Sequence, residues 1–268
     1  MSHAAVLLCG LSLVAAQPDG DLQIINPRAT YGYLGAPRLK KDGLLPGDVA
    51  HFTFEVKNLK IGPDGNAAYS LAVEVLDPQG KRRYYQPPFN AVARSLFGGS
   101  TLPCTAHLEI PLDAKPGEYV LRVTFKDRLA GKEIVVERQG KVRAANFGIV
   151  RVGTFAEAEA KVPMPAVSVL GSTMFVNFSL VGFGRSKDKK QPDVEVSLKI
   201  LDDKGKPTMA KPLTGQVQDV PEDLPLVPVQ FGLTLSRVGR FTLELSAHDR
   251  LSGKSDTVSF PIQILGLE

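Results

Sequence analysis

Apolar and polar residues alternate along most of the chain. In residues 52–56 every second side chain is apolar, and the same alternation runs through residues 119–125 and 241–247. Successive side chains of a strand point to opposite faces of a sheet, so a period of two predicts strands with one buried and one solvated face. The helical period of 3.6 residues is missing, apart from a short stretch from Ala156 to Lys161. The pattern predicts an all-β protein.

The strand pattern occurs twice. Asp127-Arg128-Leu129-Ala130-Gly131-Lys132 returns as Asp249-Arg250-Leu251-Ser252-Gly253-Lys254, an offset of 122 positions from residue 127 to residue 249. This period is longer than that of solenoid or propeller repeats, so each copy is a whole domain. Each copy has about seven short predicted strands separated by turn residues, which is typical of a Greek-key β-sandwich. The sequence therefore predicts two tandem sandwiches, over residues 22–145 and 146–268.

A family resemblance lies in residues 108–121, where Leu108-Glu109-Ile110-Pro111-Leu112-Asp113-Ala114-Lys115-Pro116-Gly117-Glu118-Tyr119-Val120-Leu121 resembles the corner between strands E and F of immunoglobulin-like domains. Tyr119 stands where that family has the tyrosine that pins the corner. Leu121 stands where antibody domains have a cysteine, and Phe241 replaces the tyrosine in the second copy. The chain is similar to tandem immunoglobulin-like or fibronectin-type repeats of bacterial exported proteins. The resemblance implies two disulfide-free immunoglobulin-like sandwiches and no particular activity, because this fold supports many functions.

The first residues have the pattern of an export signal. Ala4 to Ala16 is an apolar stretch that ends in small residues and is followed by a Pro- and Gly-containing polar segment. This predicts a signal peptide over residues 1–16 and a secreted, periplasmic or cell-surface location. No Lys or Arg precedes the apolar run, which weakens the signal-peptide prediction. The alternative is a buried first strand, but the small-residue ending and the polar segment after it argue against a strand. We expect no transmembrane segment after signal cleavage, because no other stretch is long and apolar enough.

Charge and cysteine content exclude some classes of function. The net charge of +4 over 268 residues comes from short, scattered groups of Lys and Arg beside turn residues, so we expect no nucleic-acid partner. Cleavage of the signal removes Cys9 and leaves Cys104 alone, so no disulfide can form within the mature chain. We expect Cys104 to be a packed, inert thiol.

Several polar motifs have an interpretation as turns. The repeated Asp-Arg-Leu-x-Gly-Lys motif lies between two strand patterns and predicts a hairpin turn in which Asp caps the turn and Gly takes positive φ. Residues 77–81 and 202–206 are also predicted to be turns, since they hold too few carboxylates for Ca²⁺. His51 and His107 are expected on the solvent face of neighbouring strands without a third ligand. No metal and no cofactor are therefore predicted.

Motifs of known enzymes are missing from the sequence. It contains no Gly-x-Ser-x-Gly elbow, no His-Glu-x-x-His helix and no phosphate-binding glycine loop. We therefore predict that the chain is not an enzyme and has no catalytic residues.

The two copies differ most over residues Arg82 to Thr101, which we expect to be a loop-rich edge. Tyr and Arg are the residue types that dominate binding surfaces, whereas the counterpart from Pro207 to Val227 has no aromatic residue. The candidate binding residues are Arg82, Arg83, Tyr84, Tyr85, Phe89, Arg94 and Phe97. The alternative is that the aromatic residues only cover the core beneath a long crossover.

The predicted function is that of a non-catalytic exported protein. We expect a protein-binding or structural spacer module at the cell surface or in the periplasm, with a protein or a cell-surface polysaccharide as its partner. The alternative is a carbohydrate-binding module in which Tyr84 and Tyr85 form a flat platform on which sugars stack.

Overall fold

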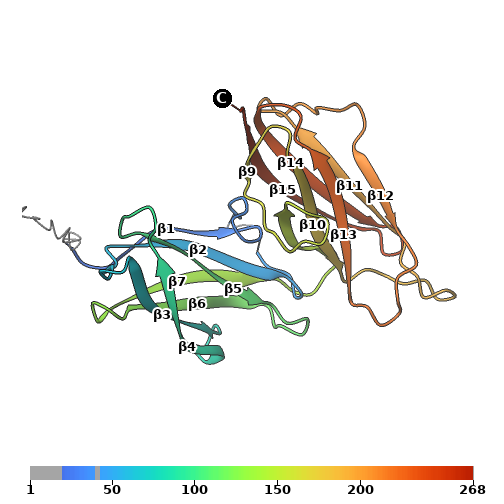
Figure 1. Ribbon diagram of the computed structural model, residues 1–268. Coiled ribbons are helices and arrows are strands. Elements are labelled where there is room, and N and C mark those ends of the chain that lie inside the picture. Colours follow the sequence, from blue (N-terminus) through green and yellow to red (C-terminus); the bar gives the residue numbers. More distant parts are fainter. Residues whose placement is uncertain (1–19, 40–42, 268) are drawn as a thin grey trace, which may run out of the picture.

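The computed structural model describes residues 20–39 and 43–267. Within them the chain forms fifteen strands and no helix, so the prediction of an all-β protein is confirmed (Figure 1). In the part of the chain that the structure describes, no helix is long and apolar enough to cross a membrane. The predicted signal peptide, residues 1–16, and Cys9 lie outside the described residues.

The first half of the molecule, residues 20–142, consists of two antiparallel sheets. One has the order β1-β2-β5, and the other has the order β4-β3-β6-β7. Between them lies a core in which Phe52 and Phe54 of the first sheet meet Val123 and Phe125 of the second. The strand bounds are β1 Gln23–Thr30, β2 Val49–Lys57, β3 Asn66–Leu76, β4 Arg82–Arg94, β5 Leu102–Glu109, β6 Gly117–Asp127 and β7 Lys132–Val142.

The second half, residues 148–265, repeats this order. One sheet has the order β13-β10-β8, and the other has the order β12-β11-β14-β15-β9, in which β9 runs parallel to β15. The facing sheets in both halves are consistent with a β-sandwich arrangement. The strand bounds are β8 Gly148–Phe155, β9 Val167–Val169, β10 Thr173–Val181, β11 Val194–Leu201, β12 Leu213–Val217, β13 Leu226–Thr234, β14 Gly239–Asp249 and β15 Lys254–Leu265.

The repeated motif forms the β6–β7 and β14–β15 hairpin turns, as predicted. The Asp127 carboxylate accepts hydrogen bonds from the backbone N–H groups of Leu129 and Ala130, both at 2.9 Å, and Gly131 has a φ of +70°. The same carboxylate accepts the Lys60 N–H at 2.8 Å, which ties the turn to a distant loop. Because Asp127 is fully buried and fully hydrogen-bonded, the motif is structural.

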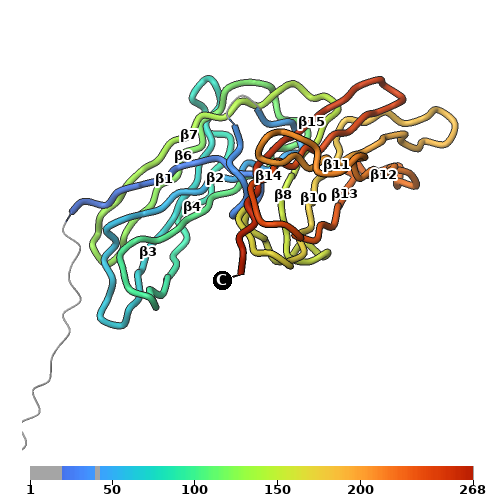
Figure 2. Tube along the Cα trace, turned by 90° about the horizontal axis from the view of Figure 1, so that it is seen from above, coloured from blue at the N-terminus to red at the C-terminus, as the bar shows by residue number. Residues whose placement is uncertain are grey.

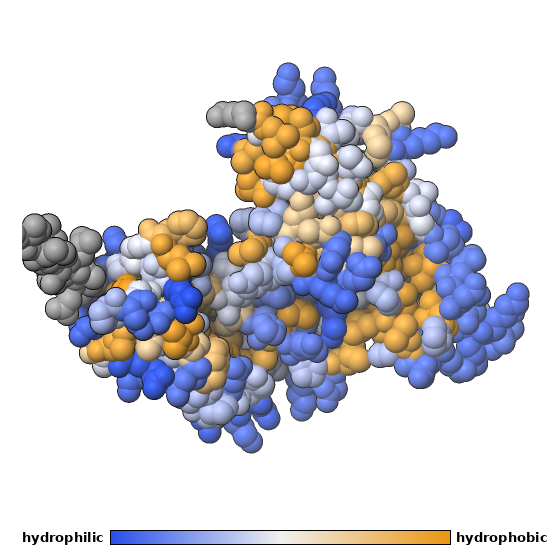
Figure 3. Space-filling view, viewed as in Figure 1, coloured by the Kyte–Doolittle hydropathy of each residue, from blue (hydrophilic) through white to orange (hydrophobic). Residues whose placement is uncertain are grey.

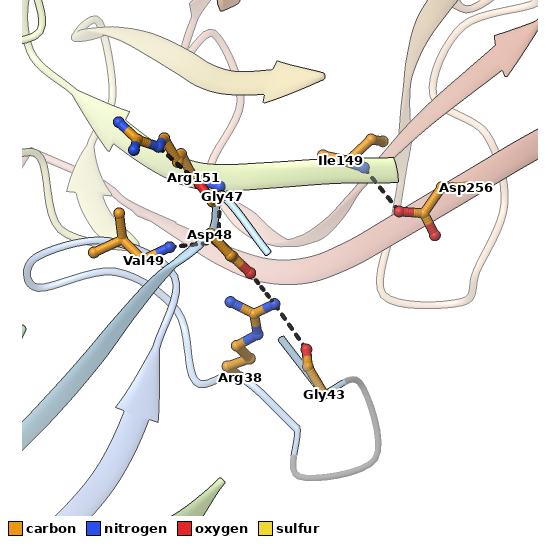
Figure 4. A network of polar contacts seen from close by, with 8 residues as sticks. All are labelled: Arg38, Gly43, Gly47, Asp48, Val49, Ile149, Arg151 and Asp256. Atoms are coloured by element: carbon orange, nitrogen blue, oxygen red, sulfur yellow. Dashed lines mark hydrogen bonds and ion pairs between the residues drawn. The ribbon is translucent and has the colours of Figure 1, made fainter. Parts of the chain in front are cut away.

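The two halves lie side by side and meet at a joint centred on Asp48 (Figures 2 and 4). One oxygen of this buried carboxylate accepts the Arg151 N–H at 2.8 Å from the second half, and the other accepts from Arg38 Nη2 at 2.6 Å. Arg151 has a φ of +55°, and its Nε donates to the Gly47 carbonyl at 2.9 Å. Tyr31, in the segment after β1, packs its ring 5.6 Å from that of Phe260. These contacts restrict the motion of one half against the other.

Candidate functional site

The segment predicted to be a loop-rich edge is a strand. Six of the seven candidate residues lie on β4, which is thirteen residues long, and Phe97 lies in the turn that follows it. Among the described strands β4 pairs with β3 alone, so its other edge is open. The prediction of a loop was wrong because β4 is exposed on both faces. A strand with no buried face has no reason to alternate apolar and polar residues.

Tyr84 and Tyr85 lie on opposite faces of the sheet. Tyr84 pairs with the buried Val75 and lines a cleft between the two sheets, whereas Tyr85 pairs with Glu74 on the outer face. The guanidinium of Arg82 lies over the Tyr85 ring, 4.5 Å from its centre. The single flat platform predicted from the sequence is therefore not formed, because neighbouring residues of a strand point in opposite directions.

The arginines of β4 differ in role. Arg83 Nε donates to the Asp77 carboxylate at 2.6 Å, and the other oxygen of Asp77 accepts the backbone N–H groups of Gln79 and Lys81. Arg83 thus stabilises the turn between β3 and β4, and the turn itself was predicted from the sequence. Arg82 is half-exposed, and Arg94 is exposed near the far end of the strand. These two arginines leave positive charge at both ends of β4.

Six apolar or aromatic side chains are exposed along β4 and its following turn. We name them the β4 edge surface: Tyr84, Tyr85, Phe89, Val92, Leu96 and Phe97. Sequence reasoning missed Val92 and Leu96, which are 64% and 76% exposed. The signal that marks them is a run from Lys81 to Leu108 with no Asp or Glu. Figure 3 shows apolar areas bordered by charged residues on this side of the molecule.

A cleft of about 850 Å³ opens between the two sheets of the first half. Its apolar walls come from Ala50, Phe52 and Leu108 on one sheet and from Val75 and Leu121 on the other. Motif searches in the sequence cannot find such a cleft, because its walls come from strands that are far apart in the sequence. Tyr84 lies at the side of the cleft that is nearest to the edge of β4.

His51 and His107 are cross-strand neighbours, with ring centres 5.9 Å apart. His107 is exposed as expected, whereas His51 is half-buried, and the segment that carries Arg38 and Asp48 lies beside it. Burial, reinforced by the neighbouring His107, lowers the pKa of His51 to about 4. Among residues 20–39 and 43–267 no three His, Cys, Asp or Glu side chains are grouped so that they could hold a metal ion.

Cys104 lies on β5 and is half-buried. Burial raises the pKa of its thiol to about 12, so almost no thiolate is present at neutral pH. An unreactive thiol of this kind matches the expectation from the sequence.

Comparisons with known proteins leave the family open. No protein-family model matches the chain, and no curated protein matches it. Among solved structures, red sea bream transglutaminase is similar over 92% of this chain and 31% of its own length, with 12% identity and a TM-score of 0.30. The chain thus spans about a third of the length of that protein.

The prediction that the chain is not an enzyme is contradicted by this finding, since the similar structure is an enzyme by its name, and the prediction is withdrawn. At this TM-score and identity, the likeness assigns neither a reaction nor catalytic residues to this chain.

Proposed function

We propose that the chain is an exported protein of two tandem Greek-key immunoglobulin-like sandwiches that binds a partner protein through the β4 edge surface. The sandwiches span residues 22–145 and 146–268, and the protein acts at the cell surface or in the periplasm after loss of residues 1–16. The observation that carries the binding function is the exposure of β4, a long edge strand with six exposed apolar or aromatic side chains.

The tandem sandwich is supported by matching strand orders in the two halves, to which the second half adds β9. The sheets β1-β2-β5 and β4-β3-β6-β7 correspond strand by strand to β8-β10-β13 and β12-β11-β14-β15. The Tyr119 hydroxyl also donates to the Lys115 carbonyl at 2.9 Å, which is the bond that pins the corner between strands E and F in the resembling family.

A protein partner is supported by the composition of the edge. Tyr, Phe and Arg contribute most of the binding energy in protein interfaces, and an open strand edge offers backbone groups to a partner strand. Long apolar edge strands promote aggregation unless they are covered. Stacking on a sugar needs an open ring face, and Arg82 occupies one face of Tyr85. A protein is therefore the better-supported partner.

Photo-crosslinking in the cells that make the protein tests this proposal. The photoreactive amino acid p-benzoylphenylalanine replaces Phe97 in the full chain, and in a control chain it replaces Leu251, which is exposed in the β14–β15 turn. We expect a covalent protein adduct from position 97 and none from position 251. The proposal is overturned if position 97 gives no adduct, or if both positions give the same adducts.

A further inference from the structure

The backbone groups of Asn90, Val92 and Arg94 point away from β3. The Ser95 N–H donates to the Gly65 carbonyl at 2.9 Å, and the next pair along the ladder is Arg94 with Asn66. Directly opposed residues of an antiparallel pair alternate between hydrogen-bonded and non-hydrogen-bonded pairs. Since Ser95 and Gly65 form a hydrogen-bonded pair, Arg94, Val92 and Asn90 are in non-hydrogen-bonded pairs. Their N–H and C=O groups therefore face the open edge.

Prolines limit the length of this edge. The register of β4 against β3 shifts between the Leu71–Phe89 and Val73–Gln86 pairs, so Pro87 and Pro88 lie at a bulge. Proline has no N–H to donate, so a partner strand cannot continue its ladder past this point. The part of β4 that can accept a strand is therefore residues 89–94.

We propose that the partner protein at the β4 edge surface is a second copy of this chain. This inference rests on the proposed function and names its partner. The two β4 strands pair antiparallel about a two-fold axis at Val92, so that Val92 faces Val92 of the second copy and Asn90 faces its Arg94. Each of these pairs joins residues whose backbone groups face the open edge, so about six interchain hydrogen bonds form.

The axis at Val92 is favoured over its neighbours. If the axis moves toward Asn90, Pro88 enters the ladder opposite Val92 or Arg94 of the second copy and its missing N–H removes a bond. If the axis moves toward Arg94, the two guanidinium groups become direct or diagonal neighbours, and like charges there are destabilising. Val92 at the axis avoids both costs and places two exposed apolar side chains together.

Positive charge on β4 permits this pairing. With Val92 at the axis the two Arg94 residues are four positions apart along the ladder, or about 13 Å. This distance exceeds the screening length of about 10 Å at 0.1 M salt. Lys81, Arg82 and Arg83 lie at the two far ends of the paired strands. The turn with Leu96 and Phe97 comes alongside Pro87 and Pro88 of the second copy, which covers the two most exposed apolar side chains of the surface.

Cysteine crosslinking tests the register. In a full chain that carries Cys9→Ser, Val92→Cys is compared with Asn90→Cys, an exposed residue on the same face of the same strand. Two residues at position 92 would have Cα atoms about 5.5 Å apart, within reach of a disulfide. Two residues at position 90 would be about 14 Å apart, too far for a disulfide. We expect mild oxidation to give at least about tenfold more covalent dimer for Val92→Cys.

Sedimentation velocity supplies the second measurement. The unmodified chain should sediment as a dimer at high concentration, and Val92→Lys should sediment as a folded monomer, because two ammonium groups would meet at the axis. The inference is overturned if the unmodified chain stays monomeric, or if the two cysteine variants crosslink equally. If the chain is monomeric while position 97 captures a different protein in cells, only the choice of partner fails. If position 97 captures nothing as well, the proposed function fails too.

Discussion

The edge strands β4 and β12 occupy corresponding places in the two halves but have different properties. β12 is five residues long and ends in the buried Val217, which packs into the core of the second half. β4 is thirteen residues long and has no buried side chain. A short, anchored edge gives a partner strand little to pair with, whereas a long exposed edge invites pairing. The comparison favours the first half as the place of the proposed binding surface.

The hydrophobic cores of the two halves also differ in size. The core cluster of the second half contains 25 buried residues, including Tyr31 and Ala36 from the segment after β1, and that of the first half contains 10. The first half also holds the cleft of about 850 Å³. Two halves with the same strand pattern can therefore differ: the second half has the larger buried core, and the first half has a smaller core and a cleft between its sheets.

The largest expected effect is at the joint between the halves. Asp48→Ala removes the buried carboxylate that accepts from the Arg38 side chain and from the Arg151 backbone N–H, and it leaves the buried Arg38 guanidinium without an acidic partner. Breaking a buried pair on one side costs about 3–5 kcal/mol. We expect calorimetry to show a lower midpoint and separate unfolding transitions for the two halves. One transition at the unmodified temperature would show that the halves are not coupled through Asp48.

The contrast between the edges can be measured directly. Val217→Ala removes buried methyl groups from β12 and should lower the free energy of unfolding by about 2 kcal/mol. Val92→Ala on β4 should change the unfolding free energy of the monomer by less than about 0.5 kcal/mol. Urea unfolding at low protein concentration measures both. Equal losses would mean that β4 is packed as firmly as β12.

His51 should make the stability of the protein depend on pH. The pKa of buried His51 is lowered to about 4 from 6.5, so between these values the unfolded chain binds a proton that the folded chain does not. Stability should be full above pH 6.5 and fall as pH drops toward 4, by about 1–2 kcal/mol after screening. His51→Gln should flatten this part of the urea-derived stability profile. If the unfolding free energy of His51→Gln depends on pH as strongly as that of the unmodified chain, His51 is not the origin of the dependence.

The smallest expected effect is at the corner before β6. Tyr119→Phe removes the hydroxyl that donates to the Lys115 carbonyl and should cost about 1 kcal/mol in urea unfolding. In the second half, the corresponding residue Phe241 already lacks the hydroxyl. Phe241→Tyr is the matched reverse change, and we expect no gain above about 0.5 kcal/mol unless a carbonyl lies in reach. A Tyr119→Phe variant as stable as the unmodified chain would show that the bond contributes nothing.

The strands and turns that depend on residues close together in the sequence were predictable. The all-β fold follows from the alternation of apolar residues, and the turns follow from Asp and Gly within a few residues, as at Asp127 and Gly131. Residues brought together from distant segments were not predictable. His51 lies beside the segment that carries Arg38 and Asp48, and the cleft is lined by strands of both sheets of the first half.

Composition selected the segment that we propose as the binding surface, but it did not predict the geometry of that segment. The aromatic and basic residues drew attention to residues 82–101, but apolar and polar residues do not alternate there, so a strand was not predicted. Because this segment was not predicted to be a strand, Tyr84 and Tyr85 were expected on one surface. In β4 they are neighbouring residues, so they point to opposite faces of the sheet.

Amide hydrogen exchange over a range of protein concentrations tests the central claim most directly. We expect that in dilute solution the amides of Asn90, Val92 and Arg94 exchange rapidly, while those of Ala91 and Ala93, bonded to β3, exchange slowly. As the concentration rises, the first three should become protected and the other two should change little. Protection of Asn90, Val92 and Arg94 that does not depend on concentration would contradict pairing of β4 with a second copy.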